Sequence, residues 1–427
     1  MTQICCAKSV GARNVPIYWE GIKRLVGISA STVYYTGAPI SRHKLGVVIG
    51  GGVELKNETL MAMPLSSYSP FLSPLLRIKF VSRKSLKLRF SCCSPVVLNA
   101  SYSTTTSSFS WDDVYGVISK PDNSTSHSSK LDGFFQRIKT CNRGFEMKSE
   151  FLPFIIEEQI AGYVHNQFAS HLRKFQDVFA FPEDNLFGNG GGGGYVILNP
   201  SLKSPEDRTK AVGDVIKCLG EGVIPGIRNE LYPVTTSYGV PAYFSLERAA
   251  APFFGIKAYG IHLIGYVDRD GEKSLWIGKR SDMKPTFSGM LDHLAAGGLP
   301  HGITCKENVM KECQEEAGIP RSISNGAVPV GAVSYIDVNG YSYKRDVLFC
   351  YDLKLPADFV PTNEDGEVES FRLIPVKDVA NIIRRTEFFK ANCCLVIIDF
   401  LFRHGYICPE DPGYLNLLQS LRSGDCS

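Results

Sequence analysis

The sequence predicts an α+β protein, in which a C-terminal α/β/α sandwich follows a smaller N-terminal α+β domain. Three observations support this fold class. The chain has 427 residues, enough for two or three domains of ordinary size. Residues 131–255 mix helix-spaced apolar residues with short strand-like runs. Residues 256–427 contain several longer strand-like runs joined by turn residues, together with few strong helical patterns.

The first 110 residues do not have the composition of a folded domain. Residues 61–110 contain no Asp or Glu, 13 Ser and six Lys or Arg. A serine-rich, basic and acid-free leader is typical of an organelle transit peptide. We expect a chloroplast destination, with the mitochondrion as the alternative and an untargeted tail as a third possibility. Residues 1–60 are interpreted as an upstream extension, with Met61 as the usual initiator, and residues 111–130 as a linker.

The N-terminal domain is predicted over residues 131–255. Helical spacing of apolar residues occurs at 131–144 and at 164–180, and a short apolar run at 151–156 follows the first of these. Another helix is expected to begin after Ser204, because Ser is a favourable cap and Pro205 suits the first turn. This mixture indicates an accessory α+β domain.

The C-terminal domain is predicted over residues 256–427. Two strand-like runs surround the turn Arg269-Asp270-Gly271-Glu272, and two more cover 330–338 and 346–353. A fifth run, at 371–375, leads into a helix, and 392–405 is predicted to form a buried apolar helix. His262 lies within the first run, where a core histidine is the simpler interpretation.

Three carboxylates share one face of a predicted helix over residues 304–317, which contain no Pro or Gly. Glu312, Glu315 and Glu316 stand at positions i, i+3 and i+4. Clustered carboxylates repel one another unless a cation lies among them, and hard oxygen ligands suit Mg²⁺ or Mn²⁺. Gly297 and Gly298 precede the helix in a segment that can offer backbone groups to a phosphate. A solvated acidic face is the alternative interpretation.

Residues 297–319, GGLPHGITCKENVMKECQEEAGI, resemble the signature G-x5-E-x7-R-E-U-x-E-E-x-G-U of the Nudix hydrolases, where U is bulky and apolar. The positions that match are Gly297, Glu312, Glu315, Glu316, Gly318 and Ile319. Two positions depart, since Ile303 replaces the first Glu and Lys311 the Arg. The resemblance implies that Glu312, Glu315 and Glu316 are catalytic metal ligands, with Mg²⁺ or Mn²⁺ as cofactor. Lys311 supplies charge but lacks the bidentate fork of Arg.

Further segments between about 131 and 420 resemble one Nudix subfamily, which has plant plastid members and is related to the Nudix portion of fungal thiamine pyrophosphokinase fusions. This resemblance implies a Nudix α/β/α sandwich and removal of a phosphate from thiamine diphosphate or its oxidised forms. A nucleoside diphosphate derivative is the alternative substrate. A non-hydrolytic, degenerate Nudix binder or sensor is the second alternative, suggested by Ile303 and Lys311.

Other residues complete the predicted site. Glu367, in the loop before a strand, is a candidate catalytic carboxylate, and Arg280 and Lys284 are candidate phosphate-binding residues together with Gly297 and Gly298. The expected partner is therefore a small organic diphosphate. A net charge of +3 does not favour nucleic acid as a partner, and no apolar run reaches the roughly 20 residues of a membrane span. The oligomeric state stays open.

Overall fold

The computed structural model describes residues 109–120, 130–182 and 194–424, all within one compact unit. The predictions for residues 1–60 and for almost all of the leader at 61–110 concern residues outside this part of the chain. Within the described ranges, every helix is too short or too polar to cross a membrane.

A seven-stranded sheet forms the centre of the C-terminal half, in the order β11-β12-β7-β8-β13, with β10 added beside β7 and β9 beside β8. The pairing of β12 with β7 is parallel, and the other pairings in this sheet are antiparallel. The strands are β7 (Lys257–Arg269), β8 (Glu272–Arg280), β9 (Leu291–Asp292), β10 (Ala295–Gly298), β11 (Val328–Asn339), β12 (Ser342–Lys354) and β13 (Val368–Pro375).

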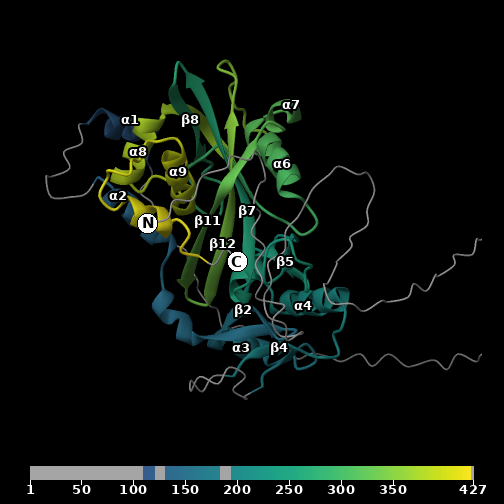
Figure 1. The fold of residues 1–427 in the computed structure, drawn as a ribbon. Coiled ribbons are helices and arrows are strands. Elements are labelled where there is room, and N and C mark those ends of the chain that lie inside the picture. The colour runs from purple at the N-terminus through teal and green to yellow at the C-terminus, as the bar shows by residue number, and fades with distance from the viewer. Residues whose placement is uncertain (1–108, 121–129, 183–193, 425–427) are drawn as a thin grey trace, which may run out of the picture. The chain divides into compact units, whose positions relative to one another are not determined.

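Helices cover both faces of this sheet, which makes the C-terminal half an α/β/α sandwich as predicted (Figure 1). Neighbouring residues of β7 face opposite layers, because side chains alternate along a strand. Ile261 and Leu263 belong to the core beneath α6, whereas Ile264 belongs to the core beneath α9. One layer holds α6 (Cys305–Ala317) and α7 (Arg321–Ser324). The other holds α1 (Trp111–Ser119), α2 (Asp132–Cys141), α8 (Val376–Arg385), α9 (Ala391–Arg403) and α10 (Tyr414–Ser420).

The prediction of a linker over 111–130 is wrong for residues 111–119, which form α1. The helix begins with a capping box, in which Ser110 Oγ accepts a hydrogen bond from the backbone N–H of Asp113 and the Asp113 carboxylate accepts one from that of Ser110. Val114 is fully buried in the core shared with α8 and α9. Helix α2, although within the range predicted for the accessory domain, packs in the same layer.

The N-terminal half forms a second sheet, of order β2-β1-β4-β3, and a two-stranded sheet β5-β6. A separate aromatic core, which includes Phe154, Phe244 and Phe254, holds these elements together. The elements are η1 (Phe145–Glu150), β1 (Phe151–Ile156), β2 (Gln159–His165), α3 (Asn166–Leu172), β3 (Phe179–Ala180), β4 (Val196–Leu198), α4 (Pro205–Leu219), β5 (Leu231–Val234), β6 (Phe244–Glu247), η2 (Arg248–Ala250) and α5 (Ala251–Phe254).

The helix expected at 164–180 is shorter than predicted, since only α3 is helical there. Val164 pairs with Leu152 in the β1–β2 ladder, and Phe179 pairs with Leu198 of β4. Sheet hydrogen bonds therefore override the helical spacing at both ends. The helix after Ser204 is confirmed, because Ser204 Oγ accepts a hydrogen bond from the backbone N–H of Asp207 and Gly220 follows its last residue.

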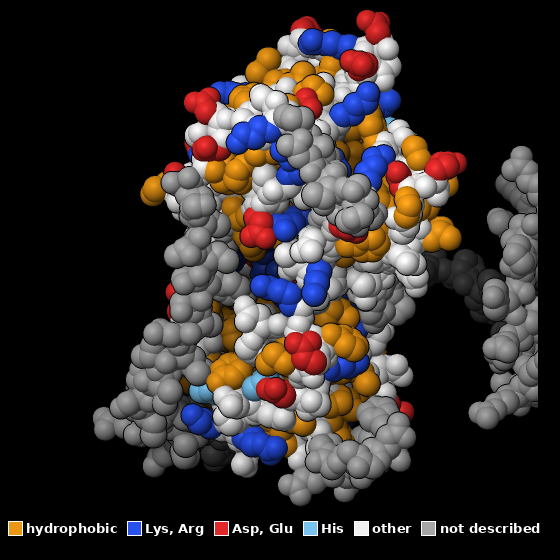
Figure 2. All heavy atoms as spheres, turned by 90° about the vertical axis from the view of Figure 1, so that its left-hand side faces the viewer, with side chains coloured by type: hydrophobic (Ala, Val, Ile, Leu, Met, Phe, Trp, Pro, Cys, Tyr) orange, Lys and Arg blue, Asp and Glu red, His pale blue; other side chains and the backbone are white. Residues whose placement is uncertain are grey.

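The face that carries the α1, α2 and α8 layer is shown in Figure 2. Basic and acidic side chains of the described residues are interspersed there with apolar ones. Such a mixture of charges is typical of an ordinary protein surface.

Candidate active site

Helix α6 has one face fixed by the core, and this determines where its carboxylates point. Thr304 Oγ caps the helix by accepting a hydrogen bond from the backbone N–H of Glu307, and Gly318 ends it with a left-handed φ of 62°. The stripe of Val309, Cys313 and Ala317 is buried against the sheet. The carboxylates of Glu312, Glu315 and Glu316 therefore project from the parts of the helix surface outside this buried stripe.

Glu316 points back toward the sheet. Its Oε2 accepts a hydrogen bond from the backbone N–H of Ala296 in β10, at 2.8 Å. Burial raises the pKa of Glu316 well above its usual value, and the negative charges of Glu312, Asp292 and Glu367 raise it further. The predicted catalytic residues Glu312, Glu316 and Glu367 are thus brought near one another.

Glu312 packs against the strand that Gly297 and Gly298 form. A Cβ at Gly297 would lie closer than 3.0 Å to Glu312 Oε1, so a residue with a side chain cannot occupy this position without movement. Burial raises the pKa of Glu312, while Lys311 opposes this shift. The carbonyl oxygen of Gly298 accepts a hydrogen bond from Asn308 Nδ2 at 2.8 Å, which ties the glycine strand to α6.

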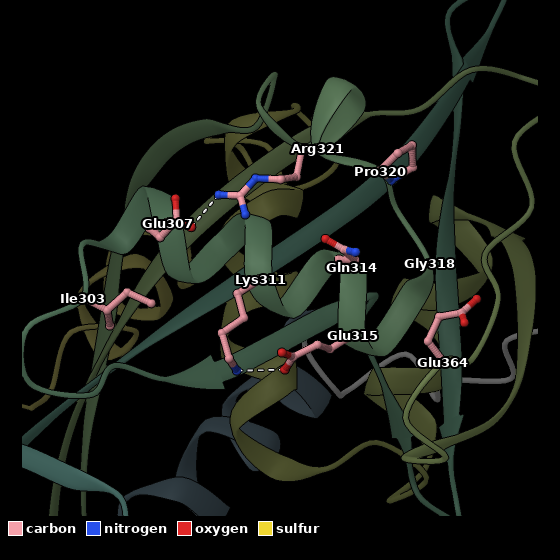
Figure 3. A pocket seen from close by; sticks show the side chains of 9 residues that line it. All are labelled: Ile303, Glu307, Lys311, Gln314, Glu315, Gly318, Pro320, Arg321 and Glu364. Atoms are coloured by element: carbon pink, nitrogen blue, oxygen red, sulfur yellow. Dashed lines mark hydrogen bonds and ion pairs between the residues drawn. The ribbon is translucent and has the colours of Figure 1, made fainter.

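Glu315 takes a different position from Glu316. Its half-exposed side chain accepts a hydrogen bond from Lys311 Nζ at 2.8 Å, and Lys311 also reaches Glu312 at 3.2 Å. Burial by itself would lower the pKa of Lys311, but the two glutamates raise it. Glu315 and Lys311 line an open hollow of about 620 Å³ on the outer side of α6 (Figure 3). The other residues that line it are Ile303, Glu307, Gln314, Gly318, Pro320, Arg321 and Glu364.

The two predicted phosphate-binding cations have different surroundings. Arg280 is largely buried, and it donates to Asp292 Oδ2 at 3.1 Å and to the carbonyl oxygens of Thr286 and Phe287. These contacts hold the loop after β8. Lys284 forms an ion pair with Glu367, so it lies next to the predicted catalytic carboxylate. Lys284 therefore contacts one of the predicted catalytic glutamates, Glu367, directly. The guanidinium of Arg280 binds Asp292 instead.

A buried polar network lies beneath the site, and the sequence predictions did not include it. Asp292 also binds Lys390 Nζ at 3.3 Å and accepts a hydrogen bond from Cys393 Sγ at 2.6 Å. Burial alone would raise the pKa of Asp292, but the neighbouring positive charges, with Lys390 foremost, hold it far below its usual value. The sequence offered no periodic or motif signal for these long-range contacts.

Three side chains of this network, His262, His293 and Cys393, lie close enough together to be considered as metal ligands. His262 Nδ1 and His293 Nε2 are 2.7 Å apart and share a hydrogen bond. Lys390 and Arg280 already supply positive charge to the adjoining Asp292. An added cation would be repelled by them, so we interpret this cluster as a hydrogen-bonded network.

His293 should make the folded state sensitive to acid. Burial lowers its pKa from 6.5 to about 4, so the unfolded chain takes up a proton first as the pH falls. The contribution to stability is present above pH 6.5 and is lost as the pH falls toward 4, at a cost of about 3 kcal/mol. Between pH 6.5 and pH 4, the unfolding free energy of His293→Gln should therefore fall by less than that of the wild type. Urea denaturation at several pH values measures the unfolding free energy of both proteins. An equal fall in the two would contradict the prediction.

Two family models match the chain, the domain of unknown function DUF4743 over residues 133–258 and the NUDIX domain over residues 260–392. The chain is 59% identical to Nudix hydrolase 20, chloroplastic, of Arabidopsis thaliana, over 83% of this chain and 93% of the relative. The chain belongs to the Nudix hydrolase family.

A second curated relative agrees with this family. Nudix hydrolase 24, chloroplastic, of the same plant is 59% identical over 75% of this chain and 86% of the relative. Both relatives are named chloroplastic, in agreement with the destination that the leader predicts. Among solved structures, the NUDIX domain of Shewanella oneidensis NrtR, complexed with ADP ribose, covers 35% of this chain and 90% of that chain, with 11% identity and a TM-score of 0.28.

Proposed function

We propose that this Nudix hydrolase removes the terminal phosphate of a small organic diphosphate, with Mg²⁺ or Mn²⁺ as cofactor. Thiamine diphosphate or its oxidised analogues are the proposed substrates, and the products are the monophosphate and orthophosphate. The observation that supports this most strongly is the convergence of Glu312 and Glu316 on the glycine strand, with Glu367 contributing its charge from another loop.

The residues present fit a divalent cation. Burial raises the pKa of Glu316, and repulsion from the neighbouring carboxylates raises it further. Oxygen ligands of this kind suit Mg²⁺ and Mn²⁺. We assign Glu312 and Glu316, which lie against strand β10, as ligands of the cation. Glu315 is assigned as a further ligand, as the family resemblance implies. When bound, the cation supplies positive charge that polarises the phosphoryl oxygens.

The side chains around the cluster have separate roles in this proposal. Glu367 accepts the proton of the attacking water, and Lys284 fixes the carboxylate through their ion pair. Arg280 keeps the loop between β8 and β9 in place by donating hydrogen bonds to the carbonyl oxygens of Thr286 and Phe287. The backbone of Gly297 and Gly298 allows the diphosphate to approach closely, because no side chain blocks it.

Glu367→Gln should lower kcat by about 100-fold and leave KM nearly unchanged, because the amide cannot accept the proton. Steady-state phosphate release measures both constants. Glu369→Gln is the matched control, since Glu369 lies two residues away and pairs with Lys279 instead. Equal losses in the two variants would show that Glu367 has no special role.

A diphosphate panel tests the substrate class. Thiamine diphosphate and oxidised thiamine diphosphate are compared with nucleotide sugars and dinucleotides, each with Mg²⁺ or Mn²⁺. We expect the highest kcat/KM for the thiamine compounds, and release of orthophosphate identified by phosphorus NMR. Preference for nucleotide derivatives would overturn the substrate assignment, and binding without hydrolysis of any compound would support a non-hydrolytic binder.

The residue ranges of the chain are also part of the proposal. We assign residues 131–255 as the accessory domain, with its first helix, α2, packed in a layer of the Nudix sandwich. Residues 256–427 are assigned as the Nudix domain and 61–110 as the transit peptide. N-terminal sequencing of the native protein tests the last of these. A mature protein that retains residues 1–60 would contradict it.

A further inference from the structure

We propose that Arg248, from the region that precedes the Nudix domain, binds a phosphate oxygen of the substrate, and that Glu230 and Tyr232 position it. This inference rests on the proposed hydrolysis of a diphosphate. It assigns part of the substrate site to the N-terminal half of the chain, outside the sequence motif.

The glycine strand provides the first evidence. Successive residues of a strand face opposite sides, and a Cβ at Gly297 would meet Glu312 whereas one at Gly298 would meet Tyr232 and Arg248. Such a Cβ at Gly298 would overlap the Tyr232 hydroxyl and would lie 3.3 Å from Arg248 Cζ. Tyr232 and Arg248 therefore lie on one side of strand β10 and Glu312 lies on the other, with only the backbone of this strand between them.

The Arg248 guanidinium is held in place by a hydrogen bond to Glu230, and its other N–H donors can bind a ligand. Its NH1 donates to Glu230 Oε2 at 2.6 Å, and its Cζ lies 5.6 Å from the centre of the Tyr232 ring. Among the described residues, Glu230 is the hydrogen-bond partner of this side chain. A guanidinium has five N–H donors, and the Arg248 side chain is 35% exposed. The remaining donors suit the oxygens of a phosphate.

The backbone fixes Arg248 and Glu230 next to each other. The backbone N–H of Arg248 donates to the carbonyl oxygen of Glu230 at 2.8 Å, directly beyond the pairing of Leu231 with Glu247 in the β5–β6 sheet. His301, in the loop between the glycine strand and α6, donates its backbone N–H to the carbonyl oxygen of Leu231. The two-stranded sheet is thereby tied to the segment that carries the active-site glycines.

Arg248 and Glu312 also lie close to neighbouring residues of one strand. A Cβ at Gly297 would meet Glu312, and one at Gly298 would lie 3.3 Å from Arg248 Cζ. A phosphate held beside these two glycines would therefore lie close to a guanidinium as well as to the proposed cation-binding carboxylates. Arg248 offers bidentate contact, which Lys cannot reproduce.

Full-length Arg248→Gln, Arg248→Lys and Glu230→Gln variants test the inference. Binding of methylenediphosphonate in the presence of Mg²⁺ is measured by calorimetry, and kcat and KM are measured with thiamine diphosphate. We expect Arg248→Gln to weaken binding of the probe by about 10- to 100-fold and to raise KM similarly. Arg248→Lys and Glu230→Gln should give intermediate losses.

Arg143→Gln is the control, because Arg143 forms an ion pair with Asp337 on the edge strand β11. It should bind the probe as the wild type does. If Arg248→Gln fails to fold, the folded Arg248→Lys variant decides, since loss of the bidentate contact must still weaken binding. Wild-type affinity in the folded Arg248 variants, together with an inactive Glu316→Ala variant, would overturn this inference alone. Full activity of Glu316→Ala would instead overturn the proposed site.

Discussion

Replacing Glu316 with alanine should reduce kcat by at least about 100-fold, because single electrostatic contributors to a phosphoryl-transfer site often account for that much. Glu316 points toward the sheet, where its Oε2 accepts a hydrogen bond from the backbone N–H of Ala296. Its loss would remove a proposed cation ligand that lies within the influence of the charges of Glu312 and Glu367. Initial rates of phosphate release at saturating Mg²⁺ and substrate measure the effect.

Glu307→Gln is the matched control for this experiment. Glu307 belongs to the same helix, but its carboxylate forms an ion pair with Arg321 on the outer side of α6 (Figure 3). Its replacement should leave kcat within about twofold, since exposed ion pairs contribute little. Full activity of Glu316→Ala, or equal losses in both variants, would refute the assignment of the inner face as the active site.

Gly297→Ala should also abolish most activity, for a steric reason. The added Cβ would lie closer than 3.0 Å to Glu312 Oε1, so either the glutamate or strand β10 must move. We expect a loss of kcat of about 100-fold, because small displacements of positioned groups have effects of this size. Overpacking should also lower the unfolding free energy by about 1–3 kcal/mol. Kinetics and urea denaturation measure the two effects separately.

Gly213→Ala provides the comparison. Gly213 lies within helix α4, and a Cβ there would have no atom within 4 Å. Alanine should be neutral or stabilising by about 0.5–1 kcal/mol, because glycine is unfavourable within a helix. If Gly297→Ala were as active and as stable as Gly213→Ala, the close contact of Gly297 with Glu312 would not matter for catalysis.

Local patterns predicted much of the fold because they reflect local physics. The cap at Ser204 and the apolar stripe of α6 are fixed by residues close in sequence, and both were predicted. The missed helix α1 depends on a distant partner, since Val114 is buried only when α8 packs against it. The helix expected at 164–180 was too long because β1 and β4, which pair with its ends, lie elsewhere in the sequence.

The candidate site divides in the same way. The spacing of Glu312 and Glu316 was visible in the sequence, because one helix carries both. Nothing in the sequence showed that Asp292 would bind Arg280, which lies across the loop before β9, and Lys390, which is separated from it by several other elements. The contact of Arg248 with the glycine strand was also invisible, because it joins the two halves of the chain.

The glycine strand makes the two halves of the protein poor candidates for exchange. Tyr232 fits against Gly298 so closely that its hydroxyl takes the space of a missing side chain. A chimera that joined this Nudix domain to the accessory region of another protein would have to reproduce that fit, as well as the guanidinium beside it. Substitutions of Tyr232 or Gly298 are therefore expected to disturb the other half of the chain, and insertions should be tolerated better in loops away from this contact.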